Sequence, residues 1–343
     1  MTTNSVTTHG VVRLDLDEDG ARQALDLASA CAARYADVDD PGFGPEAAVI
    51  AHDLPRQVRA AANQVRLAEG VHALLLRGHR VDEGLEPTPR HWRDAGTPGS
   101  RPYAFLLALY ASLLGDLIGW RTQQDGRLVT DVLPIAGLEH SLVSAGSRSE
   151  LAWHTEDAFS PHRADHVGLL CLRSPDETPT TITHLGPGDL PDDVLEVLGQ
   201  PRFHVLPDTS HTAQFSAPAG GDATAFAAVE RMRERPPLVA VVGGSPQAPT
   251  LRVDRDFMVA DEDDEQAARA LWALVEQLDR NVYEVTLAPG DVCFLDNHSV
   301  AHGRRPFGPR YDGNDRWLKR VNTVRDVRRT RPGRSTAETR VIG

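Results

Sequence analysis

The sequence has 343 residues, of which 41% are hydrophobic and 25% are charged, and its formal net charge is −13. These values are typical of a folded globular protein and exclude a disordered or fibrous chain. No segment approaches the ~20 consecutive apolar residues of a membrane-spanning helix, and the excess of acidic residues argues against nucleic acid as a partner.

The N-terminal residues and the cysteines indicate the compartment. The first ten residues contain neither the basic nor the apolar stretch of a secretory signal. The three cysteines, Cys31, Cys171 and Cys293, are far apart in the chain, which argues against a disulfide framework and against a thiolate zinc site. We therefore expect a cytoplasmic protein.

The first third of the chain is predicted to be helical. Apolar residues at helical spacing predict helices over Gly20–Val38, Leu54–Ala68 and Tyr103–Leu117. Clusters of proline and glycine near residues 41–45 and 87–99 predict loops between them.

From about residue 122 the pattern changes to short apolar runs separated by glycine and proline turns, such as Val167–Leu172 and Val292–Leu295. This pattern is typical of a β-sandwich or barrel. A further amphipathic helix is predicted over Asp263–Arg280, with the acidic residues 261–265 capping its start. The segment Ala217–Pro237 is a candidate for a mobile cover.

The predicted organisation is a single domain over residues 1–343, mainly β with flanking helices. A helical part over about 1–120 packs on a β core over about 121–330, which carries an insert near 210–280. The segment from Arg304 to Arg334 has ten Arg and one Lys against three Asp, so a solvated basic face and a site for a small anion are both open.

A candidate metal site follows from three separated residues. His154 and Glu156 are two apart in a strand-like run, so their side chains share one face. Such a pair is common by chance, but His302 follows an apolar strand far downstream. Two histidines and one carboxylate are the ligand set of non-haem Fe(II) oxygenases, which keep open positions for co-substrates. Arg316, fourteen residues later, could hold a distal carboxylate in bidentate fashion.

Three longer runs carry a resemblance to a known family: Leu151–Asp165, His302–Phe307 and Arg310–Arg320. Together they resemble the clavaminate synthase-like branch of the 2-oxoglutarate oxygenases, and most nearly the arginine 3-hydroxylases of antibiotic biosynthesis. The likeness extends in order from about Gln123 to Arg329, whereas the N-terminal third is similar only in general layout.

The resemblance implies a double-stranded β-helix (jelly roll) core that uses Fe(II), 2-oxoglutarate and dioxygen. It implies His154, Glu156 and His302 as iron ligands and Arg316 as the clamp for 2-oxoglutarate, with Thr181 as a candidate to assist. A glutamate ligand is typical of this branch, and it argues against halogenation, for which related enzymes replace the carboxylate with a small residue.

The substrate is predicted from a second set of residues. Asp254 and Asp256 project to the same side if the chain is extended there, and paired carboxylates can hold a guanidinium or an ammonium group. The arginine 3-hydroxylases have two aspartates at the matching place. Gln123 resembles a glutamine that contacts the substrate's α-amino group, where Glu156 could assist through its second oxygen. Arg320 is a candidate for the substrate carboxylate, with a structural ion pair as the alternative.

The resulting prediction is an Fe(II)- and 2-oxoglutarate-dependent hydroxylase of a free amino acid, L-arginine at C3, in antibiotic biosynthesis. Alternatives with the same chemistry are an enduracididine-like cyclic guanidino amino acid, citrulline, lysine or asparagine as substrate, or dihydroxylation or desaturation of arginine. A β-helix binding protein without catalysis and a zinc hydrolase using His154, His162 and His166 are alternatives from other classes.

Overall fold

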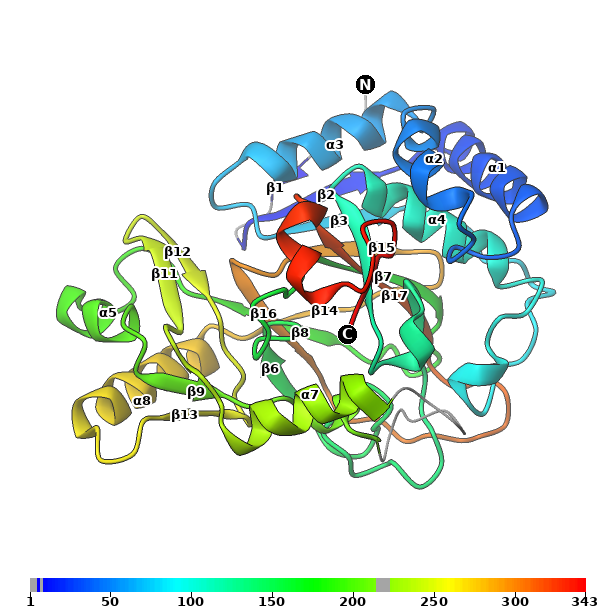
Figure 1. Ribbon diagram of the computed structural model, residues 1–343. Coiled ribbons are helices and arrows are strands. Elements are labelled where there is room, and N and C mark those ends of the chain that lie inside the picture. The colour runs from blue at the N-terminus through cyan, green and yellow to red at the C-terminus, as the bar shows by residue number, and fades with distance from the viewer. Residues whose placement is uncertain (1–4, 7–8, 214–222) are drawn as a thin grey trace.

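The computed structural model describes residues 5–6, 9–213 and 223–343 (Figure 1). Its helices are α1 Glu18–Arg34, α2 Phe43–Ala51, α3 Arg56–Leu67, α4 Arg101–Ser112, α5 Asp192–Leu198, α7 Ala223–Glu234 and α8 Glu265–Arg280. Short 3₁₀ helices are η1 Trp92–Asp94, η2 Gln124–Gly126, η3 Thr209–His211 and η4 Val327–Gly333. None of the described helices is long and apolar enough to cross a membrane.

Two sheets form the centre of the molecule. The larger has nine strands, β1 Ser5–Val6, β2 Val11–Asp15, β3 Ala73–Arg77, β15 Val292–Asp296, β7 His166–Arg173, β17 Trp317–Val324, β4 Asp116–Trp120 and β18 Val341–Ile342 in spatial order, with β5 Val129–Val132 also pairing with β17. The smaller has four strands, in the order β14 Tyr283–Val285, β8 Thr180–His184, β16 Val300–Arg304 and β6 Leu151–His154. Strands distant in sequence are therefore neighbours in both sheets.

Two minor sheets lie in and just before the region predicted as an insert, since β9 precedes residue 210. One has the order β10 Leu238–Val239, β9 Phe203–Val205 and β13 Met258–Ala260, and the other pairs β11 Val242–Ser245 with β12 Ala248–Leu251. In Figure 1 these strands lie with α5 and α8 on one side of the molecule, whereas α1, α2, α3 and α4 lie together on another.

The described residues form four apolar cores, three of which lie in layers because side chains alternate along the strands. On β15, Phe294 packs with the N-terminal helices, whereas Leu295 packs between the two main sheets. The core between the sheets also receives Ile182 of β8 and Val300 of β16. On the opposite side of β16, Ala301 joins a third core formed with α5, α8 and the minor sheets.

The predicted helices are confirmed as α1, α3, α4 and α8, with ends that differ by a few residues. Helix α2 was missed because Pro45 and the preceding glycines indicated a loop. Pro45 lies in the first turn of α2, where a missing N–H breaks no helical hydrogen bond. Within the acidic run, Asp264 is the residue that caps α8, since its side chain accepts from the Ala267 N–H at 3.0 Å.

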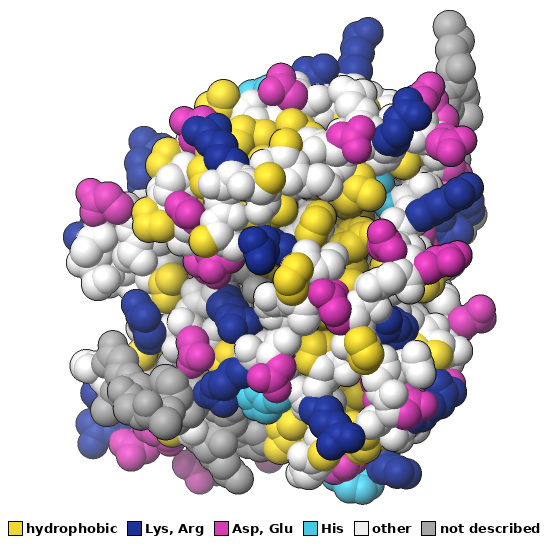
Figure 2. Space-filling model, turned by 90° about the vertical axis from the view of Figure 1, so that its right-hand side faces the viewer, with side chains coloured by type: hydrophobic (Ala, Val, Ile, Leu, Met, Phe, Trp, Pro, Cys, Tyr) yellow, Lys and Arg dark blue, Asp and Glu magenta, His cyan; other side chains and the backbone are white. Residues whose placement is uncertain are grey.

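The predicted cover falls partly outside the described residues. Residues 217–222 are not described, and the remainder begins with α7. On the face shown in Figure 2, positive and negative side chains are interspersed, without a large patch of either sign.

Candidate active site

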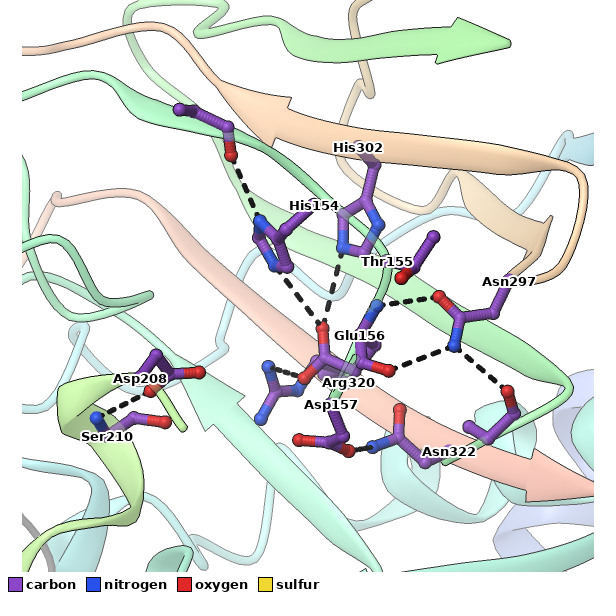
Figure 3. Close-up of polar contacts among 12 residues, drawn as sticks. His154, Thr155, Glu156, Asp157, Asp208, Ser210, Asn297, His302, Arg320 and Asn322 are labelled. Carbon is purple, nitrogen blue, oxygen red and sulfur yellow. Dashed lines mark hydrogen bonds and ion pairs between the residues drawn. The ribbon is translucent and has the colours of Figure 1, made fainter. Parts of the chain in front are cut away.

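The smaller of the two main sheets brings the predicted metal ligands together. β6 and β16 are antiparallel neighbours, and His154 pairs directly with His302 across them. Glu156 follows β6, and its Oε2 lies 3.8 Å from His154 Nε2 and 3.5 Å from His302 Nε2 (Figure 3). All three ligand atoms lie within 4.8 Å of one another, and in the described part of the chain no other group of this kind could hold a metal ion.

Neighbouring groups orient these side chains. His154 Nδ1 lies 3.0 Å from the carbonyl oxygen of Ala152, which orients the ring so that Nε2 faces Glu156. Asn297 accepts from the Glu156 N–H at 2.7 Å and donates to the Glu156 carbonyl at 3.0 Å (Figure 3). Glu156 Oε2 is buried without a hydrogen-bond partner. A buried carboxylate oxygen left in this way fits a bound cation.

The charged groups around Glu156 keep its carboxylate ionised. Burial alone would raise the pKa of Glu156, but Arg320 and the two histidines outweigh it and hold that pKa well below its usual range. Burial lowers the pKa of His302, with Glu156 acting in the opposite direction. An ionised carboxylate and a neutral imidazole are the forms that bind a metal.

Arg316 is a buried cation for which the described residues provide no ion-pair partner. It precedes β17, is 6% exposed and lines the same cavity as the three ligands. Its Nε has no hydrogen-bond partner, and within the described residues its guanidinium makes no ion pair. Burial lowers the pKa of Arg316 to about 10, so the group remains charged at neutral pH. An unpaired charge in such a place is strongly unfavourable unless an anion binds to it.

Thr180 and Thr181 differ in their position relative to the cavity. Thr180, one residue earlier on β8, lines the cavity, whereas Thr181 does not. Alternation explains the difference, because Thr180 shares its face with Ile182, which packs between the two main sheets.

The two predicted aspartates lie in the same cavity. Asp254 forms an isolated bridge with His154, and Asp256 lines the cavity beside Phe257. Asp254 Oδ1 accepts from the N–H groups of Asp256 and Phe257, at 3.1 Å each, which fixes the turn that presents both carboxylates. Burial raises the pKa of Asp254 to about 6.

Two further residues of this cavity were missed by sequence reasoning. Asp208 and Ser210, just before and within η3, also line it. Asp208 Oδ1 accepts from the Ser210 N–H at 2.6 Å (Figure 3). In the sequence this arrangement is indistinguishable from an ordinary helix cap.

Gln123 and Arg320 lie beside the carboxylate ligand. One nitrogen of Arg320, Nη1, is 2.5 Å from Glu156 Oε1, and Nη2 donates to Gln123 Oε1 at 3.0 Å. Both residues line the cavity. The second oxygen of Glu156 is therefore engaged by Arg320, so the ion pair named as the alternative for Arg320 is present.

The zinc alternative is wrong for the described residues. His166 begins β7 and His162 lies in a turn before it, so they do not share a helical face. Neither joins His154 in a group that could hold a metal. Within the basic segment, Arg328 and Arg329 pair with Asp326 and Asp165, as a solvated basic face would.

Comparison with known proteins agrees with this geometry. Residues 201–322 match the model of the taurine catabolism dioxygenase TauD, TfdA family. The chain is 40% identical to an enduracididine beta-hydroxylase of Streptomyces hygroscopicus, over 97% of this chain and 100% of that protein. It is also 40% identical to an L-ornithine/L-arginine 3-hydroxylase of Catenulispora acidiphila, over 91% and 94%. The chain belongs to the TauD/TfdA dioxygenase family.

Its place within this family is the clavaminate synthase-like branch, since clavaminate synthase 2 of Streptomyces clavuligerus is 31% identical over 82% of both chains. The crystal structure of the non-heme iron oxygenase OrfP in complex with Fe, succinate and (3S)-hydroxy-L-Arg has a TM-score of 0.93 and 40% identity, over 96% of this chain and 99% of OrfP. The predicted family membership is confirmed, and the fold is that of these iron oxygenases.

Proposed function

We propose that this family member is an Fe(II)- and 2-oxoglutarate-dependent hydroxylase of a free amino acid, with L-arginine at C3 as its substrate. The observation that carries the proposal is one cavity lined by a two-histidine, one-glutamate group, an unpaired buried arginine and several aspartates. Iron, the anionic co-substrate and a cationic side chain each have a complementary partner there.

His154, Glu156 and His302 would hold Fe(II), because they offer one lone pair each and the buried Glu156 Oε2 lacks a partner. When bound, the metal supplies the oxidation chemistry of this family. Arg316 would bind the distal carboxylate of 2-oxoglutarate through two parallel hydrogen bonds. Thr180, rather than Thr181, would assist it from β8.

The amino acid would lie across the rest of the cavity. Asp254 and Asp256, helped by Asp208, would hold the guanidinium, since three carboxylates favour a cation with several donors. Gln123 Oε1 would accept from the α-ammonium group, and Arg320 would pair with the α-carboxylate while it keeps Glu156 in place. Binding at both ends aims C3 at the metal, and such positioning is what determines the site of reaction.

We also propose that the two main sheets form a double-stranded β-helix and that residues 1–343 form a single domain. The shared core between the sheets supports the first point. The second is supported by β2 and β3, which join the sheet beside β15 and so tie the N-terminal part to the core. Location in the cytoplasm stays a prediction, supported by three free, buried cysteines.

A second candidate substrate is a cyclic guanidino amino acid, because the enduracididine beta-hydroxylase is as similar to this chain as the ornithine/arginine enzyme. OrfP also has a complex with (3R,4R)-dihydroxy-L-Arg, which makes a second hydroxylation of arginine a further outcome to examine.

The test is incubation of the purified protein with Fe(II), ascorbate, 2-oxoglutarate and one amino acid in air, with succinate and product masses measured together. L-Arginine, enduracididine, L-citrulline, L-lysine and L-asparagine form the panel. Arginine that gains one oxygen in step with succinate, with the hydroxyl at C3 by NMR, is the expected result. Succinate formed only with another member of the panel would overturn the choice of arginine, and no succinate with any would overturn the function.

A further inference from the structure

A fully buried histidine lies directly behind the cavity without lining it. His211 is the last residue of η3, and its ring packs edge-on against Trp120 and Phe159 at centroid distances of 5.5 and 4.9 Å. Its Nδ1 lies 2.7 Å from Thr122 Oγ1, and its Nε2 lies 2.9 Å from Asp157 Oδ1. Both ring nitrogens are therefore engaged by polar partners.

The partner at Nε2 is the residue next to a metal ligand. Asp157 follows Glu156, is buried, lines the cavity and has a left-handed backbone with φ of 55°. A non-glycine residue keeps this conformation only where its surroundings hold it. His211 makes the short contact to Asp157, whereas Asn322 donates to its other oxygen from 3.5 Å (Figure 3).

His211 itself belongs to the 3₁₀ helix η3, which lies at the part of the cavity proposed to bind the substrate. Asp208 and Ser210, which line the cavity, lie within three residues of His211 on the same short segment. Ser210 Oγ accepts from Gln123 Nε2 at 2.9 Å, and His211 Nε2 is 3.0 Å from the same nitrogen. One imidazole thus contacts the turn after Glu156, the residue proposed for the α-ammonium group, and the segment that carries Asp208.

We propose that His211 is a positioning residue that fixes the substrate-contacting segment Asp208–Ser210 relative to the metal-binding turn at Glu156. It acts through Asp157 and Gln123 and touches neither substrate nor metal. Its loss leaves both Asp157 and η3 without their common anchor, so the bound amino acid is aimed less accurately at the metal. Poor aim reduces coupling, because 2-oxoglutarate is then consumed without hydroxylation of the amino acid.

His211→Phe tests this, because phenylalanine keeps the ring packing against Trp120 and Phe159 and removes the three polar contacts to Thr122, Asp157 and Gln123. We expect the dissociation constant for arginine, measured by calorimetry without oxygen, to rise about tenfold. The ratio of hydroxylated arginine to succinate should fall at least several-fold. The affinities for Fe(II) and 2-oxoglutarate should stay within about twofold of wild type.

Two further variants separate positioning from simple stabilisation. His211→Gln places an amide nitrogen near the original Nε2 and should restore coupling through Asp157. His211→Asn reaches only toward Thr122 and should behave like His211→Phe. If His211→Phe does not fold, the comparison of His211→Gln with His211→Asn tests the proposal by itself. The matched control is His204→Phe, since His204 lies on β9, outside the cavity lining, and forms a 3.2 Å pair with Asp261.

The inference rests on the proposed function, because it requires an amino-acid substrate. Wild-type protein that forms no succinate with any amino acid overturns the proposed function itself. Wild-type turnover together with unchanged arginine affinity and coupling in His211→Phe overturns only the role of His211. Equal coupling in the Gln and Asn variants, or the same loss in His204→Phe, also overturns it.

Discussion

Replacing Arg316 with methionine should have two opposite effects, one on stability and one on 2-oxoglutarate binding. The guanidinium is 6% exposed and makes no ion pair within the described residues. Burial lowers its pKa from 12.5 to about 10. A shift of this size corresponds to about 3 kcal/mol by which the folded protein without ligand disfavours the charge.

Methionine fills a similar space without the charge, so Arg316→Met should stabilise the ligand-free protein by up to about 3 kcal/mol. The same change removes two charge-assisted hydrogen bonds to the co-substrate, each worth roughly 1.5 kcal/mol or more. The KM for 2-oxoglutarate should therefore rise by about 100-fold or more. Urea unfolding with and without 2-oxoglutarate measures the effect on stability, and initial rates at varied 2-oxoglutarate concentration measure the effect on KM.

Arg304 provides a matched control in the same cavity. It is 3% exposed, and burial lowers its pKa to about 9, but its guanidinium donates to the carbonyl oxygens of Ser147 and Ser149. Arg304→Met removes both of these hydrogen bonds, although the Ser147 carbonyl keeps the one from the Phe307 N–H, and should destabilise the protein. The reasoning fails if Arg316→Met lowers the ligand-free stability as Arg304→Met does, or if 2-oxoglutarate still stabilises Arg316→Met as it does wild type.

Three other predictions follow from the site and the core. Asp254→Asn should raise the KM for arginine at least about tenfold and leave the neutral amino acid citrulline almost unaffected in a competition assay; equal effects on both would contradict a guanidinium contact. Thr180→Val should raise the KM for 2-oxoglutarate a few-fold whereas Thr181→Val should not, and the reverse result would return the role to Thr181. Burial lowers the pKa of His79 to about 4, below its unfolded value near 6.5, so its contribution to stability is present above pH 6.5 and is lost as the pH falls toward 4. Between pH 6.5 and pH 4, urea unfolding should show a smaller decrease in the free energy of unfolding for His79→Gln than for wild type. An equal decrease in both proteins would refute this prediction.

Much of the site is visible in the sequence because its chemistry depends on short spacings. His154 and Glu156 have the two-residue spacing that predicts side chains on one face of an extended chain, and the longer runs around His302 and Arg316 are specific enough to indicate the family. The amphipathic pattern of α8 likewise requires only a helical period. These features are local, so they can be read without knowledge of what packs against them.

The tertiary structure decided which face of a strand lines the cavity and which charged residues pair. Thr181 and Ile182 on β8 are both buried, so the strand shows no polar face that would tell which side lines the cavity. The contact between Arg320 and Glu156 joins a residue of β17, in the larger sheet, to a residue just after β6, in the smaller sheet.

The role of the Asp208–His211 segment also needed the fold. Its polar residues have the pattern of any capped turn, and they meet Gln123 and Asp157 only because β4, β6 and η3 are brought together by packing of the cores. The sequence by itself determined which chemical groups are available and the local direction of each side chain. Which groups meet was decided by the tertiary structure, because such contacts depend on long-range burial that no local pattern records.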